Sequence, residues 1–346
     1  MKILVFFLIV ILFSSCVKNP TGVSQEMIAE NVSGVYVLNE GNFGRGNSEI
    51  SFYNFNQQKI YNNIFYNTNH KNLGDVGNEI EIRDSLGYIV VNNSHKIEII
   101  NINSNINIAT INIGQNRSPR QMEFLNDSIA LVTNLYDNSV LVLNVFQKSI
   151  LKRIQVGNNP EGIAIFGNKC FVANSGLGNG NTISILDLEN FEVRNTLKVG
   201  DNPVEIKIDN DGEVYVLCAG KYNSFTDTTD DTWSKIFIVS PTTEKIIDSI
   251  FIGDHSFKMV LTNNDNGFAC GEKNILQINT LTNKLIGIFF SGKFYSIAYD
   301  EINHNLYLSD AKNYIQNGTI KVISILGQFR NSFDVGINPS SFAFKK

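Results

Sequence analysis

The chain has 346 residues, a formal net charge of -5 and an isoelectric point near 5.5. This mildly acidic composition, with no block of lysine and arginine, argues against nucleic-acid binding, which needs a basic patch to neutralise phosphates. After Cys16 three cysteines remain. Because their number is odd, they cannot form a complete disulfide framework. None of them has the paired CxxC spacing of a zinc site.

The N-terminus has the form of an export signal. Lys2 supplies a positive charge, residues 3–13 form an unbroken apolar run, and two small residues and a cysteine follow directly. The apolar run is far shorter than the ~20 residues that a membrane-spanning helix needs. Residues 1–15 are therefore predicted to be a signal peptide that is removed from the mature protein.

Ser14, Ser15 and Cys16 resemble a lipobox, in which the signal is cut before the cysteine and the thiol carries lipid. The resemblance implies that acyl chains on Cys16 hold the protein on a lipid bilayer. Val17 resembles a residue that permits export to the outer membrane, so a lipid anchor there is expected, on the periplasmic side or at the cell surface. A plain secretory peptide that happens to contain Cys16 is the alternative. Residues 16–33 have no sustained apolar period and are predicted to be the lipidated cysteine and a flexible tether.

Residues 34–346 are built from a repeated unit of four short strands. Residues 158–200 contain four runs rich in valine, isoleucine and phenylalanine, EGIAIF, CFVAN, TISILDL and VRNTLKVG, separated by turn residues. The segments before and after repeat this order run for run. Helical repeats are the competing interpretation, but no stretch has apolar residues at a spacing of 3.6 and β-branched residues dominate.

The repeat predicts an all-β fold, a seven-bladed β-propeller of four-stranded antiparallel blades. The intervals between successive units are 42, 41, 43, 53, 38 and 45 residues, near the ~40–45 residues of known propeller repeats. The N-terminal piece supplies three runs, the third at residues 60–66, and the C-terminal piece supplies only an opening run. We therefore expect N- and C-terminal strands to share one blade and close the ring, which leaves no open strand edge. The unit openings are Gly77, Pro119, Pro160, Pro203, Ser256, Phe294 and Pro339.

Three segments carry a family resemblance. FVAN at residues 171–174, LVTN at 131–134 and YVLN at 36–39 resemble the YVTN-type (YncE-like) β-propeller repeat, and the likeness extends from about residue 34 to the end. It implies the fold but not the function, because that repeat serves binding proteins, lactonases and surface proteins alike.

A narrower resemblance lies at residues 37–53, VLNEGNFGRGNSEISFY. This stretch is similar to the opening blade of lipid-anchored propellers that accompany TonB-dependent outer-membrane transporters, including the BtuG-type corrinoid-capturing proteins. The resemblance implies a corrinoid as a candidate ligand and a TonB-dependent outer-membrane receptor as a candidate partner.

Propeller topology places two sets of connections on one face: those leading into each innermost strand, and those between the second and third strands. Both sets are long and polar in this chain, whereas the opposite face has only short turns. Long polar loops on a rigid scaffold are where binding usually resides. The longest connection, residues 218–235, contains Tyr222, Phe225 and the only tryptophan, Trp233, although Trp233 packing under its own loop is the alternative.

We therefore predict a ligand site on this face. Exposed aromatic rings resemble the anchors of binding sites, and charged groups from several blades surround the axis. The alternative for each charged residue taken singly is that it belongs to the solvated rim of the face and binds no ligand. The predicted ligand-binding residues are Glu40, Phe43, Arg45, His95, Arg120, Tyr136, Glu161, Glu205, Tyr222, Trp233, Lys258, Tyr295 and Tyr314.

Two other groups of residues are predicted to be structural. Cysteines within or after apolar runs are expected to be buried small hydrophobes. Asparagines that end equivalent second strands are expected to satisfy turn amides. These residues are Cys170, Cys218, Cys270, Asn39, Asn92, Asn134 and Asn174.

No catalytic constellation is present in the sequence. The four histidines form no HExxH, HxH or triad spacing, and no GxSxG motif occurs. The glycine-rich residues 176–180 join two strands and precede no helix, which argues against a phosphate-binding loop. Paired carboxylates facing one another across the axis stay open for Glu40, Glu161 and Glu205. No metal and no cofactor is predicted.

Three functions follow in order of preference. The first is ligand capture at the outer membrane, with a corrinoid passed to a transporter. The second is a protein-interaction or surface-layer role without a small ligand. The third is a lactonase- or lyase-like enzyme that uses acidic groups near the axis; of these, the non-enzymatic functions are expected.

Overall fold

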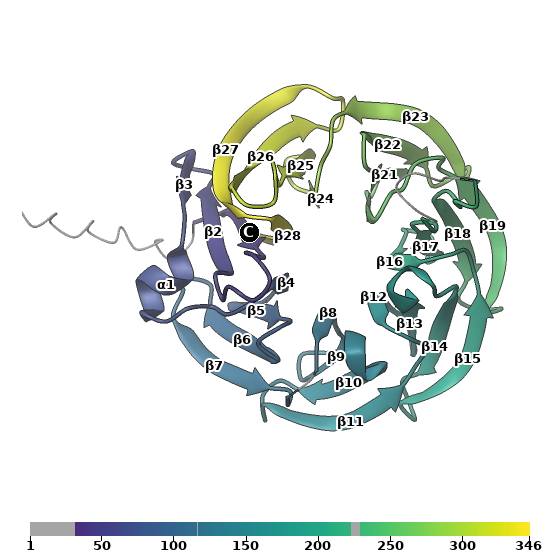
Figure 1. Ribbon diagram of the computed structural model, residues 1–346, viewed down its shortest axis with the longest axis horizontal. Coiled ribbons are helices and arrows are strands. Elements are labelled where there is room, and N and C mark those ends of the chain that lie inside the picture. The colour runs from purple at the N-terminus through teal and green to yellow at the C-terminus, as the bar shows by residue number, and fades with distance from the viewer. Residues whose placement is uncertain (1–31, 116, 223–228) are drawn as a thin grey trace, which may run out of the picture.

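The computed structural model describes residues 32–115, 117–222 and 229–346 (Figure 1). The predicted signal peptide, Cys16 and nearly all of the tether lie outside these residues. Within the described ranges no helix is long and apolar enough to cross a membrane.

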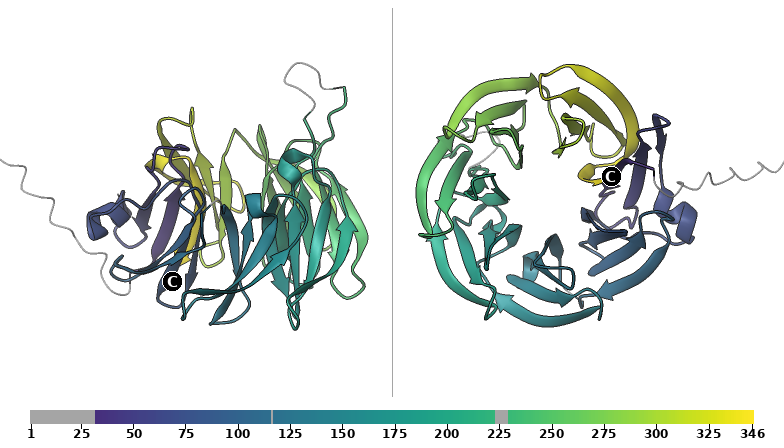
Figure 2. Two further views of the ribbon diagram at one scale, coloured as in Figure 1. Left: turned by 60° about the horizontal axis from the view of Figure 1, so that its bottom comes forward. Right: turned by 180° about the vertical axis from the view of Figure 1, so that it is seen from behind.

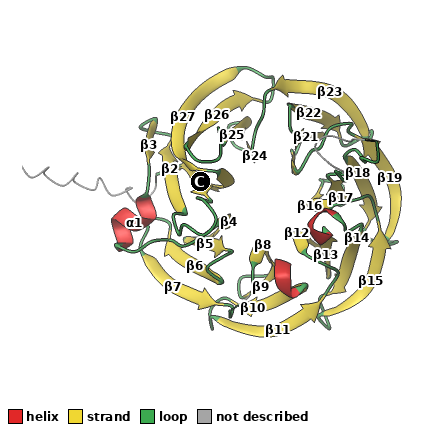
Figure 3. Cartoon of the chain, in the orientation of Figure 1, coloured by secondary structure: helices red, strands yellow, loops and turns green. Residues whose placement is uncertain are grey.

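The described residues form a closed ring of seven four-stranded antiparallel sheets (Figures 1 and 3), which confirms the predicted propeller. Blade 1 combines both ends of the chain: β28 (Pro339–Lys345), β1 (Gly34–Asn39), β2 (Glu49–Asn54) and β3 (Lys59–Tyr61). Blade 2 contains β4 (Gly77–Arg83), β5 (Leu86–Val91), β6 (Lys96–Asn101) and β7 (Asn107–Asn112). Blade 3 contains β8 (Pro119–Phe124), β9 (Ile129–Asn134), β10 (Ser139–Asn144) and β11 (Ser149–Gln155). Blade 4 contains β12 (Pro160–Phe166), β13 (Lys169–Asn174), β14 (Thr182–Asp187) and β15 (Glu192–Lys198).

The remaining blades repeat this order from the axis outward. Blade 5 contains β16 (Pro203–Ile208), β17 (Val214–Cys218), β18 (Lys235–Ser240) and β19 (Lys245–Phe251). Blade 6 contains β20 (Lys258–Leu261), β21 (Asn266–Cys270), β22 (Asn274–Asn279) and β23 (Lys284–Ser291). Blade 7 contains β24 (Ser296–Asp300), β25 (Asn305–Asp310), β26 (Asn317–Ser324) and β27 (Phe329–Ile337). Three short helices complete the description: α1 (Ile64–Asn69), η1 (Leu135–Asp137) and η2 (Gly176–Gly178), the last two being 3₁₀ helices.

The hydrophobic core lies between the blades and not within them. Buried side chains group into seven clusters, each made by one pair of neighbouring blades. The second strands, such as β9 and β13, are buried almost throughout and are therefore apolar on both faces, whereas the outermost strand β15 is largely exposed. Because each sheet buries its faces only against its neighbours, every blade depends on the two beside it.

The ring closes by strand pairing at blade 1. Strand β1 pairs antiparallel with β28 from Gly34 to Asn39 on one side and with β2 on the other. Aromatic packing joins this blade to blade 7: the rings of Tyr53 and Phe333 stack with centroids 4.3 Å apart, and Tyr307 meets Phe344 edge-on at 5.3 Å. Closure by shared N- and C-terminal strands is thus confirmed.

The third run of blade 1 differs from the prediction. Residues 60–66 were expected to form one strand, but β3 ends at Tyr61 and helix α1 begins at Ile64. Asn63 between them is left-handed (φ 56°), which turns the chain out of the sheet. Ile64 and Phe65 then bury their side chains in the cluster between blades 1 and 2. Burial of these two apolar side chains therefore favours the helix here over the longer strand that the sequence pattern predicted.

The residues predicted to be structural are buried. Asn134 accepts a hydrogen bond at Oδ1 from the Ser118 backbone N–H (2.6 Å), and Asn92 donates from Nδ2 to the Pro119 carbonyl (2.9 Å). Each of these asparagines thereby ties its strand end to the connection that enters a blade. Asn39 and Asn174 instead donate to serine hydroxyls within their own blades. The three cysteines are free and buried.

Candidate ligand-binding site

The two sets of long connections lie on one face, as predicted. Backbone hydrogen bonds join them within a blade: Leu135 N–H donates to the Ser118 carbonyl (2.8 Å), and Glu40 N–H donates to the Asn338 carbonyl (2.9 Å). In the side view of Figure 2, η1 and η2, which belong to these connections, lie toward the same end of the ring as the connection that follows β17.

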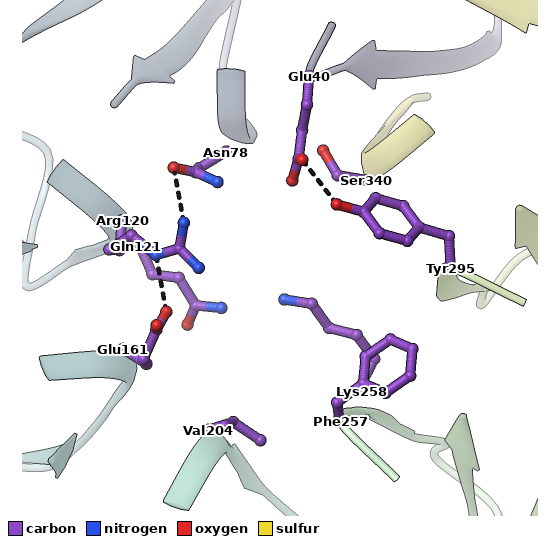
Figure 4. Close-up of a pocket in the computed structure, with 10 residues that line it drawn as sticks. All are labelled: Glu40, Asn78, Arg120, Gln121, Glu161, Val204, Phe257, Lys258, Tyr295 and Ser340. Carbon is purple, nitrogen blue, oxygen red and sulfur yellow. Dashed lines mark hydrogen bonds and ion pairs between the residues drawn. The ribbon is translucent and has the colours of Figure 1, made fainter. Parts of the chain in front are cut away.

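A pocket opens at the centre of this face, with a volume of about 200 Å³. Seven of its ten lining residues stand directly after the blade openings, one from each blade, so the ring of blades itself positions them (Figure 4). These seven are Asn78, Arg120, Glu161, Val204, Phe257, Tyr295 and Ser340. The other three lining residues are Glu40, Gln121 and Lys258.

One wall of the pocket is an ion pair. Arg120 donates from Nε to Glu161 Oε2 (2.7 Å) and from Nη1 to Asn78 Oδ1 (3.2 Å). Although burial acts against its charged form, the Glu161 carboxylate raises the pKa of Arg120 above its ordinary value. The guanidinium is therefore charged and fixed in orientation by residues from blades 2 and 4.

The opposite wall carries a carboxyl group in a poorly solvated place. Glu40 Oε2 accepts a hydrogen bond from the Tyr295 hydroxyl (2.7 Å). Burial raises the pKa of Glu40, and the Tyr295 hydrogen bond and the charges of Arg120 and Lys258 offset this only in part. The charged form of the Glu40 carboxyl group is thus disfavoured by its burial.

The Lys258 ammonium points into the pocket from blade 6 (Figure 4). Its Nζ is 3.2 Å from Glu205 Oε2, and Lys207 Nζ is 2.9 Å from the other oxygen of the same carboxylate. Although burial opposes it, these two lysines hold the pKa of Glu205 below its ordinary value. Glu205 is therefore a buried counter-ion beneath the pocket floor.

Beneath the pocket, a channel of about 330 Å³ follows the axis. It contains Glu79, Glu81 and Glu123 from blades 2 and 3, together with Glu205 and Lys207. Glu79 accepts a hydrogen bond from the Met122 backbone N–H, which clasps blade 2 to blade 3. Burial raises the pKa of Glu79 to about 7 and, with the charges of Glu79 and Glu123, that of Glu81 to about 9.

The structure brings together five of the thirteen predicted ligand-binding residues in the central pocket: Glu40, Arg120, Glu161, Lys258 and Tyr295. It places Glu205 in the channel and Tyr222 in an adjoining groove. The other six line neither the central pocket nor this groove: Phe43, Arg45, His95, Tyr136, Trp233 and Tyr314.

These six residues have identifiable surroundings. The His95 ring contacts the Arg117 carbonyl through Nδ1 and so joins two connections, while Arg45 lines a separate cavity beside α1. The Tyr314 ring meets Tyr295 edge-on at 5.9 Å and supports the pocket wall from outside. Phe43, Tyr136 and Trp233 are 75%, 61% and 47% exposed, and Trp233 packs its ring 5.0 Å from that of His255. Of the predicted aromatic residues, Tyr295 alone therefore lines the central pocket and Tyr222 alone lines the adjoining groove.

Five pocket residues were not predicted: Asn78, Gln121, Val204, Phe257 and Ser340. Four of them follow a blade opening directly, as Arg120 and Glu161 do. The position directly after each opening is thus the sequence signal for these four residues, of which none is charged and only Phe257 is aromatic.

Comparison with solved structures shows the fold. The chain is similar to a quinonprotein alcohol dehydrogenase-like protein from Bacteroides thetaiotaomicron, with 14% identity and a TM-score of 0.69 over 90% of this chain and 78% of that one. It is also similar to the Kuenenia stuttgartiensis hydrazine synthase, with 16% identity and a TM-score of 0.64 over 77% and 88% of the two chains. The WD40 β-propeller domain of Doa1 matches with 13% identity and a TM-score of 0.59 over 80% and 86%.

No curated protein matches the chain. A family described as "Domain of unknown function (DUF5074)" matches residues 33–221, more than half of the chain. This match begins just before β1 and ends in the connection after β17, so it covers β1 to β3 of blade 1, blades 2 to 4 and the two inner strands of blade 5. The chain therefore belongs to the DUF5074 family.

Proposed function

We propose that this propeller is a lipid-anchored, extracytoplasmic binding protein that captures a small polar ligand at the central pocket. In its specific form the proposal names a corrinoid as the ligand and a TonB-dependent outer-membrane transporter as its recipient. The anchor is supported by the N-terminal pattern that ends at Cys16, and the corrinoid by the resemblance of residues 37–53 to corrinoid-capturing propellers.

The single observation that carries the binding role is the arrangement of charge in the central pocket. Arg120 is fixed by Glu161 and Asn78, and Lys258 extends toward the centre from the other side (Figure 4). Both cations are paired with carboxylates, so they are held in place before a ligand arrives, and binding then costs little side-chain ordering. Donors on Arg120, Lys258 and Gln121 suit a ligand rich in amide, carboxylate or phosphate oxygens.

The size of the pocket sets how such a ligand binds. Its volume of about 200 Å³ is below the ~300–1,000 Å³ of pockets that enclose a drug-sized molecule. A corrinoid, which carries amide side chains and one phosphate around a large ring, would insert a polar substituent and extend its ring over the face. The polar pocket would thus orient the bound ligand, and the surrounding face would provide most of the contact area with its ring.

We expect cyanocobalamin to bind the purified protein with a dissociation constant in the micromolar range or below, measured by isothermal titration calorimetry. Lys258→Gln should weaken binding roughly tenfold, because a hydrogen bond to a charged group contributes about 1.5–3 kcal/mol. Lys312→Gln is the matched control, since Lys312 belongs to the same face and pairs with Asp310 outside the pocket. Absence of heat at micromolar protein would remove the corrinoid, and equal effects of the two variants would remove the central pocket.

The anchor has its own test. Cys16→Ser should move the protein from the membrane fraction to the soluble fraction of cells that express the full chain, because the thiol that carries the lipid is gone. Fractionation and intact-mass measurement of the mature chain are the readouts, with Cys170→Ser, a buried cysteine, as the control. A Cys16→Ser protein that still sediments with membranes, or a wild-type chain whose mass shows no acyl groups, would contradict lipid anchoring.

A further inference from the structure

A groove of about 460 Å³ lies beside the central pocket on the same face. Its walls are residues 175–179, between β13 and β14 of blade 4, and residues 220–222, which follow β17 of blade 5. Glu161 and Val204 line both the groove and the central pocket, so the two spaces adjoin at these residues. A ligand that extends from the central pocket past Glu161 and Val204 therefore enters the groove.

Tyr222 forms a rigid aromatic wall of this groove. Its ring stacks on the ring of His255, with centroids 3.8 Å apart and planes inclined by 23°, and its hydroxyl donates to Glu272. His255 is itself buried, with Nδ1 3.0 Å from the Ala219 carbonyl. Tyr222 nevertheless stays 48% exposed. One face of the ring is thus backed by protein while the residue still opens onto the groove, and an aromatic ring fixed in this way is suited to stacking.

Leu177 faces the groove in a strained conformation. Its backbone is left-handed (φ 52°, ψ 46°) although it is not glycine, and glycines stand on both sides of it. This region is unfavourable for a bulky L-residue, and glycine in its place would be unstrained. The side chain is 57% exposed and belongs to no core cluster of the described residues. Other bulky residues of the described chain, such as Val76 and Phe191, also adopt positive φ, so it is the combination of this strain with exposure on the groove that marks Leu177 as a candidate ligand contact.

We infer that this groove is a second subsite, which takes a planar ring between Leu177 and Tyr222. The ring belongs to the same ligand whose polar part occupies the central pocket, so the inference rests on the proposed binding function. Asn179, Asn202 and Lys221 also line the groove, and they supply hydrogen-bonding groups for the polar edge of the ring. The ligand class is a two-part molecule with a flat, partly apolar ring and an oxygen-rich polar group.

The test uses benzamide, a planar ring that bears one amide, and acetamide, the same amide without the ring. Trp233 is the only tryptophan and lies 5.0 Å from the His255 ring on which Tyr222 stacks, so its fluorescence reports on the groove. Benzamide should change this fluorescence with a saturable, millimolar affinity at least tenfold stronger than that of acetamide. Leu177→Gly should weaken benzamide at least fivefold while the melting temperature stays equal or rises. Leu326→Gly, at another exposed leucine, should leave benzamide binding unchanged.

Two results would overturn the subsite: no preference for benzamide over acetamide, or undiminished benzamide affinity in Leu177→Gly. A drop in melting temperature of Leu177→Gly would also overturn it, since the leucine would then serve the fold. These outcomes can be told apart from a failure of the proposed function, because Lys258→Gln in the cyanocobalamin calorimetry tests the central pocket, whereas Leu177→Gly tests the groove. Cobalamin binding without a benzamide response removes the ring subsite alone, and a benzamide response without cobalamin binding removes only the corrinoid.

Discussion

Removal of residues 338–346 should unfold the whole ring and not merely fray one blade. These residues contain β28, the innermost strand of blade 1, which is paired along the full length of β1. Ala343 packs in the cluster between blades 1 and 2, and Phe342 and Phe344 pack against the cluster between blades 7 and 1. Phe342 and Phe344 are partly buried, so each contributes less than the ~3–5 kcal/mol that loss of a fully buried phenylalanine costs. Together with the loss of a whole paired strand, their removal is still comparable to the ~5–15 kcal/mol net stability of a typical domain.

The measurement is a thermal melt followed by circular dichroism, together with size-exclusion chromatography. The truncated chain should show no cooperative transition above room temperature, and it should elute as an expanded or aggregated species. Addition of a synthetic peptide of residues 338–346 should restore part of the transition, because the peptide can occupy the vacant place beside β1. A truncated chain that melts within a few degrees of the full chain would show that ring closure is dispensable.

The repeat in the sequence predicted the fold because every blade obeys the same packing rule. Second strands buried on both faces are apolar over most of their length, and a proline stands at the start of the innermost strand in four blades, so both features recur along the chain. Strands β8, β12, β16 and β28 begin at the predicted prolines. At Ser256 and Phe294, which lack the proline, the strands begin two residues later, at Lys258 and Ser296. Ser256 and Phe294 thus open their repeats as the prolines do, but the strands of these two blades begin two residues farther along the chain.

Local departures from the repeat were not predictable in the same way. Helix α1 is only six residues long, too short to show a helical period, and its first two residues are as apolar as the strand residues that they replace. The sequence pattern likewise does not show in which direction a loop side chain points. For this reason the predicted ligand-binding set contains Phe43 and Tyr136 together with Glu40, although only Glu40 lines the central pocket. At the starts of the innermost strands the axis of the ring fixes where side chains point, and the predicted set contains the pocket residues Arg120, Glu161 and Tyr295 there. It lacks the residues at the equivalent positions of the other blades, which are Asn78, Val204, Phe257 and Ser340.

Glu81→Gln should make the protein more stable at alkaline pH. Burial, helped by the charges of Glu79 and Glu123, raises the pKa of Glu81 to about 9 in the folded chain, against about 4.3 in the unfolded chain. The folded protein therefore holds a proton that the unfolded chain releases above this lower value. The stability that this proton contributes is complete below about pH 4 and declines as the pH rises toward 9. Glutamine resembles the protonated carboxyl, so the variant should lose this decline.

At pH 8 we expect Glu81→Gln to raise the free energy of unfolding by a few kcal/mol, with about 5 kcal/mol as the upper bound that the two pKa values set at about 1.36 kcal/mol per pKa unit, and at pH 4 to leave it nearly unchanged. Urea unfolding at both pH values measures the difference. Glu205→Gln is the matched control in the same channel, and its expected sign is opposite. Because Lys207 and Lys258 lower the pKa of Glu205, its charge stabilises the fold above the unfolded pKa, and that contribution is lost as the pH falls. Removing it should destabilise the protein at pH 8, since two lysines would lose their shared counter-ion. Should both glutamine variants change the stability at pH 8 in the same direction, the channel would not hold one protonated and one ionised carboxyl group.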